Sequence, residues 1–167
     1  MKKINKILFL LIGLLYITNI GYSQNISCEE NKVQRTIYCN TESLSLINFT
    51  KNSPTVFLIQ SYKSDTKSYS FNLMMLSDSI KYLLTSHATI VTERNKFIIP
   101  LYYVMTKQHF HNHTLQLYDI GLNKKQMNII SSSSFAYIVI NKDVYYIPEN
   151  GLSLTKQLMY ISKKYDK

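Results

Sequence analysis

The sequence has few of the residues on which common catalytic motifs depend. Among its 167 residues there is no tryptophan, and there are only four glycines, three prolines and two cysteines. Cys28 and Cys39 lie eleven residues apart, which excludes a C-x-x-C redox pair. No serine–histidine–acid order, no spaced pair of carboxylates and no internal repeat stands out. The usual hydrolase patterns and repeat architectures are therefore not indicated.

Acidic residues are also scarce, with 10 Asp and Glu against 19 Lys and Arg, and the formal net charge is +9. The basic residues are spread along the chain, whereas nucleic-acid-binding proteins concentrate them on one face. We therefore expect no nucleic-acid partner. What the chain does have is 14 tyrosines, which favour a strand-rich core with polar-tipped aromatic side chains.

The first 23 residues have the pattern of a secretory signal peptide. Three early lysines precede an apolar run from Ile7 to Ile17, which is too short for a comfortable membrane span of about 20 residues. Gly21 and Ser23 mark a cleavage site that leaves Gln24 first, and this resembles exported proteins of the Bacteroidetes type. We expect a periplasmic or secreted protein without stable membrane insertion after cleavage; an uncleaved anchor is the alternative.

Residues 24–53 are interpreted as an N-terminal extension that contains both cysteines. In an oxidising compartment we expect a disulfide between Cys28 and Cys39, which would hold a segment that otherwise frays. A reactive pair or a metal site is the alternative. Residues 54–167 are interpreted as one domain.

The centre of that domain reads as strand, helix, strand. The apolar run Thr55 to Ile59 predicts a strand, and the polar tract Gln60 to Ser68 predicts a loop. Leucines and isoleucines from Leu73 to Leu84 recur at helical spacing, and Ala88 to Val91 begins a second β-branched run. This order predicts a βαβ unit with two parallel strands.

Further elements are expected after residue 96. We predict a strand that Pro100 confines to an edge or a bulge, a second strand, a short helix, a hairpin with the turn Asn141 to Asp143, and a final amphipathic helix. In chain order these elements span Phe97–Met105, Thr114–Tyr118, Leu122–Ile130, Phe135–Ile140 with Val144–Ile147, and Leu152–Ile161.

This order of elements resembles the thioredoxin-like fold. The resemblance covers about residues 54–165 and implies an α/β, three-layer sandwich. Its central mixed sheet would have β-α-β and α-β-β-α halves and an inserted strand pair. It rests on the strand Val56 to Ile59, the stretch Tyr118-Asp119-Ile120 before a helix, and the hairpin around Asn141-Lys142-Asp143.

The chemistry of the thioredoxin family does not carry over to this chain. Ser64 and Lys67 stand at about the positions of its two cysteines, and Ser134 stands where it has a cis-proline. A serine and a lysine cannot exchange a disulfide. The resemblance therefore implies a scaffold without cofactor that binds a protein or a peptide, and we expect no enzymatic activity.

Three histidines alternate in the tract His109 to His113. On a strand His109, His111 and His113 would point to the same side, and imidazole is the commonest metal ligand in proteins. Residues four apart on a strand lie roughly 13 Å apart, so at most two could share a metal with a more distant ligand such as His87. A solvated loop tip is the alternative.

Three functional hypotheses follow. The first is an exported binding module for a protein or peptide, and it accounts for most of the chain. The second is a metal-binding protein or metal-dependent enzyme that uses the histidine tract. The third is a thiol redox protein that uses Cys28 and Cys39.

Overall fold

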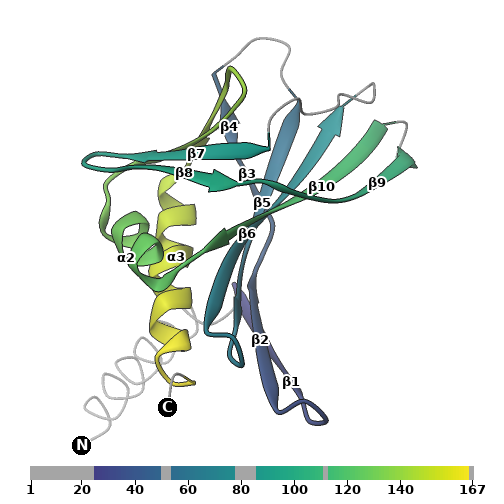
Figure 1. Ribbon diagram of the computed structural model, residues 1–167. Helices are drawn as coiled ribbons and strands as arrows, with labels where there is room; N and C mark the ends of the chain where they lie inside the picture. The colour runs from purple at the N-terminus through teal and green to yellow at the C-terminus, as the bar shows by residue number, and fades with distance from the viewer. Residues whose placement is uncertain (1–24, 50–53, 78–85, 111–112, 166–167) are drawn as a thin grey trace, which may run out of the picture.

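The computed structural model describes residues 25–49, 54–77, 86–110 and 113–165, and for residues 107–113 no side chain is described. The expected signal peptide lies outside these residues. The described chain forms two antiparallel β-sheets and two helices, α2 and α3, as Figure 1 shows.

The larger sheet has seven strands. Its order is β1-β2-β5-β6-β10-β9, and β3 pairs with β5 beside this path. Every pairing in it is antiparallel. The strands are β1 (Ile26–Asn31), β2 (Thr36–Thr41), β3 (Leu44–Ser45), β5 (Thr55–Lys63), β6 (Ser68–Ser77), β9 (Tyr102–Phe110) and β10 (His113–Leu122).

The smaller sheet has five strands in the order β4-β12-β11-β7-β8, again all antiparallel. The expected N-terminal extension supplies β1 to β4, which pair with strands of both sheets. The strands are β4 (Ile47–Asn48), β7 (His87–Thr92), β8 (Lys96–Pro100), β11 (Ala136–Ile140) and β12 (Asp143–Ile147).

Strict alternation of side chains gives the seven-stranded sheet two different faces. On β5 and β6 every second residue is buried and the residues between are half-buried or exposed. Such period-two burial is what an antiparallel strand with one covered face requires. The buried set includes Val56, Leu58, Phe71, Leu73 and Tyr69, which join a single hydrophobic core.

The helices cover the inner face of this sheet. They are α2 (Lys124–Ser132) and α3 (Glu149–Ser162), and a capping box between Asn123 and Gln126 begins α2. The buried side-chain amide of Gln60 on β5 donates to the carbonyl oxygen of Gly151 at 2.8 Å, and the hydroxyl of Tyr69 on β6 contacts that of Ser162 at 2.6 Å. These bonds fix α3 against the sheet.

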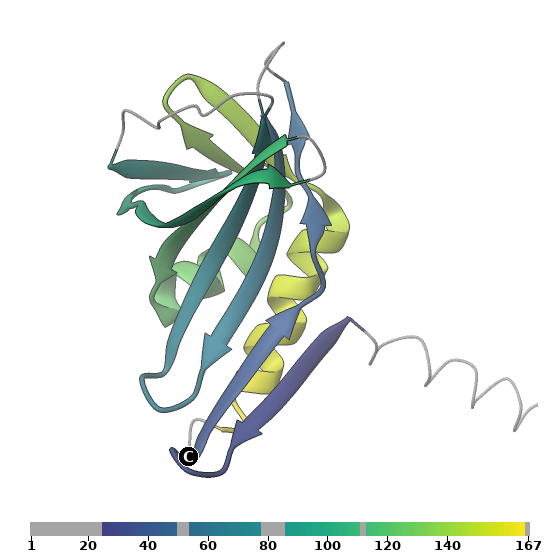
Figure 2. The same cartoon turned by 90° about the vertical axis from the view of Figure 1, so that its right-hand side faces the viewer.

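The opposite, outer face of the seven-stranded sheet carries no described helix. Figure 2 views the sheet from this side, and α3 lies behind the strands. The outer face is built by the half-buried residues that alternate with the core positions on β5, β6 and β10.

The expected α/β, thioredoxin-like sandwich with a mixed sheet is wrong. The described chain is mostly antiparallel strand, arranged in two sheets, and no described pair of strands is parallel. The order of the last four elements, helix, hairpin and helix, is compatible with many folds. Pairing partners, which element order does not reveal, make the difference.

The predicted βαβ unit fails at its helix. The part of the predicted helix that the structure describes is strand β6, which forms a hairpin with β5, and the predicted loop Gln60 to Ser68 consists mostly of strand. Every second residue of β6 belongs to the core: Tyr69, Phe71, Leu73 and Met75. The predicted helix included only some of these apolar positions. Residues 78–85 of that prediction lie outside the described residues.

Several local predictions are confirmed. The hairpin around Asn141 forms β11 and β12, and the final amphipathic helix is α3, whose N-cap is Pro148 without a side-chain hydrogen bond. Pro100 lies at the end of the edge strand β8, where a missing N–H costs least.

Candidate functional site

Strand β8 is an edge strand of the smaller sheet, and strand β9 is an edge strand of the larger one. They follow one another along the chain, β8 pairs with β7 in the smaller sheet, and β9 pairs with β10 in the larger one. Between them Leu101 is buried, and its amide donates to the carbonyl oxygen of Ser86 at 2.8 Å. The chain thus passes from one sheet edge to the other as one continuous ribbon, visible in Figure 1.

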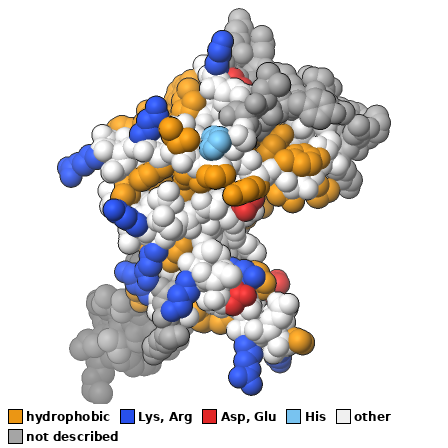
Figure 3. All heavy atoms as spheres, in the orientation of Figure 1, with side chains coloured by type: hydrophobic (Ala, Val, Ile, Leu, Met, Phe, Trp, Pro, Cys, Tyr) orange, Lys and Arg blue, Asp and Glu red, His pale blue; other side chains and the backbone are white. Residues whose placement is uncertain are grey.

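This ribbon carries an unusual share of exposed apolar side chains. Five of the nine large hydrophobic residues that are exposed in the described chain lie between residues 98 and 105, so the apolar surface is concentrated rather than scattered. They are Ile98, Tyr102, Tyr103, Val104 and Met105, with exposed fractions from 43% to 69%. Figure 3 shows hydrophobic side chains gathered along β8 and β9 on this face of the molecule.

A β-bulge lies within this run of exposed residues on β9. Tyr118 pairs with Tyr103 and Leu117 with Met105, so Val104 is the extra residue of the strand. Tyr103 is held in place by its ring contact with Tyr118, at 5.8 Å between centroids, and by its hydroxyl, which donates to Thr106 Oγ1 at 2.8 Å. The bulge therefore presents an ordered apolar surface.

The edge position adds a second property. Within the described residues β9 has one neighbouring strand, β10, so its other side presents backbone N–H and C=O groups. Proteins usually protect such an edge with charged side chains or proline. Lys96 and Pro100 do so on β8, whereas Tyr102 to Met105 on β9 are apolar. Backbone donors beside apolar side chains are what an added polypeptide strand requires.

The two cysteines lie where a disulfide was expected. Cys28 on β1 and Cys39 on β2 are directly opposite in the antiparallel pair, and their sulfur atoms are at disulfide distance, 2.09 Å. Cys39 is buried in the core and Cys28 is exposed at the outermost strand. The pair links the two strands of the β1–β2 hairpin at the edge of the sheet. The redox role for these residues stays a prediction.

Ser64 and Lys67 occupy the tight turn between β5 and β6, not the start of a helix. The hydroxyl of Ser64 accepts from the amide of Ile37 at 2.8 Å. Lys67 adopts a left-handed backbone conformation, with φ of 48°, which closes the hairpin. Both residues have structural roles in this turn.

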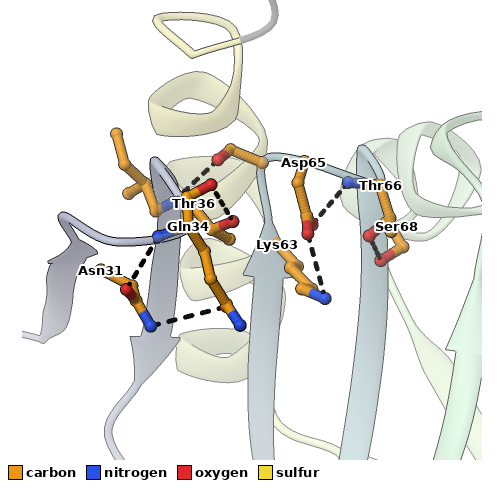
Figure 4. A network of polar contacts seen from close by, with 9 residues as sticks. Asn31, Gln34, Thr36, Lys63, Asp65, Thr66 and Ser68 are labelled. Atoms are coloured by element: carbon orange, nitrogen blue, oxygen red, sulfur yellow. Dashed lines mark hydrogen bonds and ion pairs between the residues drawn. The ribbon is translucent and has the colours of Figure 1, made fainter.

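An ion pair of 3.2 Å joins Lys63, at the end of β5, to Asp65 in the same turn, as Figure 4 shows. The hydrogen bond with Asp65 raises the pKa of Lys63. Desolvation alone would raise the pKa of Asp65, but hydrogen bonds from Lys63 and from the Thr66 amide outweigh it and lower the pKa. Because both groups are exposed, the pair contributes little to stability.

Ser134 lies in the loop after α2, far from the β5–β6 turn in sequence. Its backbone amide and its hydroxyl both donate to Oε1 of Glu93, in the turn after β7. The hydroxyl bond, followed by the amide bond, holds the pKa of Glu93 below its ordinary value. Ser134 therefore connects two loops and is not placed beside Ser64 by any described contact.

The histidine tract falls at the tip of the β9–β10 hairpin. His109 and His113 belong to these strands, but their side chains, like all of His111, are outside the described residues. Among the residues that are described, no group of three potential metal ligands comes together. Metal binding by the tract stays a prediction.

The sequence predicted one strand over Phe97–Met105 that Pro100 confines to an edge or a bulge, whereas the structure divides this stretch into β8 and β9 in different sheets. The exposed apolar surface was not predicted. The signal was present in Tyr102-Tyr103-Val104-Met105, four large apolar residues in a row without the alternation of a half-buried strand. A strand in which every second residue is apolar is expected to have one covered face. A strand with four apolar residues in a row is expected to have both faces covered or neither.

Neither described helix has the length and apolar character needed to cross a bilayer. No protein-family model, no curated protein and no solved structure matches the chain.

Proposed function

We propose that this is an exported, non-catalytic binding protein that takes up an extended polypeptide segment along strand β9. The observation that carries the proposal is the concentration of exposed apolar side chains, Tyr102 to Met105, on a strand with only one described neighbour. The N-terminal sequence pattern supports export.

Strand addition accounts for both features of β9. The backbone of an extended peptide supplies hydrogen bonds that match the open side of an edge strand, and alternate side chains of the peptide cover apolar residues on either face. An aliphatic ligand would contact the side chains of β9 but would leave the backbone N–H and C=O groups of β9 without hydrogen-bond partners. An extended polypeptide is therefore the ligand class that the edge fits.

A selected peptide and a matched pair of variants test the proposal. A twelve-residue peptide enriched from a random display library on the mature protein is labelled, and its affinity is measured by fluorescence anisotropy. Val104→Lys places a charge on the edge, and we expect it to weaken binding at least tenfold, about 1.4 kcal/mol. Val33→Lys makes the same chemical change at a residue that is 94% exposed in the β1–β2 turn and should leave the affinity unchanged.

A second measurement separates strand addition from general apolar adhesion. The same peptide, N-methylated at alternate residues, loses backbone donors on one edge while keeping its side chains. We expect at least one of the two alternating N-methyl patterns to abolish binding. Undiminished binding of both methylated peptides, or a loss of affinity with Val33→Lys equal to that with Val104→Lys, would contradict the proposal. A wild-type dimer that Val104→Lys makes monomeric in sedimentation would replace the peptide with a second copy of the chain.

A further inference from the structure

The outer face of the seven-stranded sheet contains a second chemical feature, independent of the β9 edge. The registers place side chains of three strands in rows across this face. One row joins Ile59 on β5, Asn72 on β6 and Asp119 on β10, and Asp119 is followed by Tyr102 on β9. Residues two positions along the strands form the next row on the same face.

The carboxyl group of Asp119 belongs to a polar group in the middle of this face. Ser61 and Ser70 share a hydrogen bond of 2.8 Å, and the side-chain amide of Asn72 donates to Ser61 at 2.8 Å. Asp119 lies directly opposite Asn72 in the register of β10 and β6, and hydrogen bonding from Ser70 and from the Ile120 amide lowers the pKa of its carboxyl group against the effect of burial. Hydroxyl and amide groups thus lie around a carboxyl group on this sheet face.

Asp119 is nevertheless incompletely satisfied. Its Oδ1 atom is buried and accepts no hydrogen bond from the described residues, and none of their basic side chains forms an ion pair with it. A carboxylate in this setting loses hydration without gaining a cation, which is costly. Desolvation accordingly raises the pKa of Asp119, although the bonds from Ser70 and Ile120 act in the opposite direction.

An apolar hollow lies further along the same sheet face, two to four residues from this polar group. It has a volume of about 260 Å³ and is lined by Ser43, Phe57, Met74, Leu76 and Leu115. Met74 is two residues beyond Asn72 along β6, and Leu115 is four residues before Asp119 along β10. Four residues of a strand span about 13 Å, so the hollow and the carboxyl group are within reach of one small, elongated molecule.

We propose that the outer face of the seven-stranded sheet binds a small aliphatic amine, with its ammonium group on Asp119 and its hydrocarbon chain in the hollow beside Met74 and Leu115. An ammonium group supplies the charge and the donors that Asp119 lacks, whereas a carboxylate ligand would be repelled. Because Oδ1 is shielded, binding includes a small displacement of the side chains around it. The hydrocarbon chain gains from leaving water in proportion to its buried area.

Titration calorimetry with n-octylamine tests this site on the mature protein. We expect saturable binding of one amine per chain. The uncharged analogue 1-octanol and the oppositely charged octanoate should bind at least tenfold more weakly, because only the amine complements a carboxylate. Equal affinity for octanoate would overturn the proposal, as would the absence of saturable binding of the amine.

Three variants locate the site. Asp119→Asn keeps the shape of the side chain but removes its charge, and it should weaken octylamine binding at least tenfold. Asp65→Asn removes an exposed carboxyl group in the turn between β5 and β6 of the same sheet; it is the matched control and should have no effect. Leu115→Trp fills the hollow and should weaken the amine and 1-octanol alike.

The result is separable from peptide binding at the edge. Val104→Lys should leave octylamine binding unchanged, because Val104 is the bulged residue of β9 and does not line the hollow. An equal effect of Asp119→Asn and Asp65→Asn would show that the amine associates with the protein through net charge alone and would overturn the proposal.

Discussion

At the scale of single residues, the buried polar groups of the core have specific partners. Gln60 lies on the inner, buried face of β5, where an apolar side chain is expected. Its amide group donates to the carbonyl oxygen of Gly151 and accepts from the hydroxyl of Thr155 at 2.7 Å. Because both the nitrogen and the oxygen of the amide are hydrogen-bonded, this burial is tolerable. Gln60 thereby specifies where α3 sits on the sheet.

Gly151 is required at that contact because there is no room for a side chain. A Cβ atom there would lie 2.4 Å from Cδ2 of Leu44 and 2.9 Å from Cγ2 of Ile147. We predict that Gly151→Ala lowers the free energy of unfolding by about 1–3 kcal/mol through overpacking, despite the better helix propensity of alanine. Chemical denaturation measures the change.

Gly121→Ala is the control for this prediction. A Cβ atom at Gly121 would have no neighbour within 4 Å, so the same substitution should change the free energy of unfolding by no more than about 0.5 kcal/mol. Equal destabilisation by both substitutions would show that close packing at α3 is not the cause.

At the scale of elements, the hairpin β1–β2 is the part of the larger sheet that depends most on a covalent link. β1 pairs only with β2 in the described chain, and all of its residues after Ile26 are exposed. It therefore buries little apolar surface and gains little from the hydrophobic effect. Cys39, by contrast, is buried beside the core residue Tyr62 that it pairs with.

We predict that the double variant Cys28→Ala/Cys39→Ala is less stable by about 2–3 kcal/mol, since the disulfide restricts the unfolded chain over a short loop. Urea denaturation gives the stability. Hydrogen exchange should show lost protection in β1 before β6 or β10, because β1 lacks a second neighbour. Alkylation of both cysteines in exported wild-type protein without reductant would refute the disulfide.

At the scale of the whole molecule, the described residues form two antiparallel sheets and two helices around one hydrophobic core, and no described element covers two surfaces of this part. One is the β8–β9 edge, and the other is the outer face of the seven-stranded sheet. Both carry features that a fold selected for stability alone would remove, the first exposed apolar side chains and the second an unsatisfied carboxyl group. This is the reason for assigning binding roles to them.

Asp119 should make the stability of the whole molecule depend on pH. Because its pKa is raised in the folded state, the folded chain keeps a proton over a range in which the unfolded chain has lost it. The contribution of Asp119 to the free energy of unfolding therefore falls as pH rises from the ordinary range of an aspartate through the raised pKa. Solvent screens this partly exposed carboxyl group, so we expect the change to be about 1 kcal/mol or less.

Asp119→Asn removes this dependence. We predict that the variant gains stability relative to wild type at pH 7 and that the gain shrinks toward pH 3. The comparison cancels the exposed carboxyl groups of Asp65 and Glu93, whose pKa values are lowered and which both proteins share. Melting temperatures of the two proteins measured in parallel check the trend, and a gain that grows toward low pH would contradict it.

Local sequence by itself determined the elements whose signals are local. A β-branched and aromatic run around a polar turn is enough to predict the hairpin β11–β12, and leucines at helical spacing after Pro148 are enough to predict α3. The opposed cysteines were also predictable, because only two were present. In each case the physical cause lies within a few residues.

Only the tertiary structure decided which strands pair, and with that the fold and its open surfaces. The apolar residues from Leu73 onward satisfy helical spacing as well as alternation, and the hairpin partner β5, with α3 covering one face, selects the strand. Ile59, Asn72 and Asp119 come from separate parts of the sequence and meet only through strand register. Pairing depends on the summed burial of distant segments, a quantity that no single stretch of sequence contains.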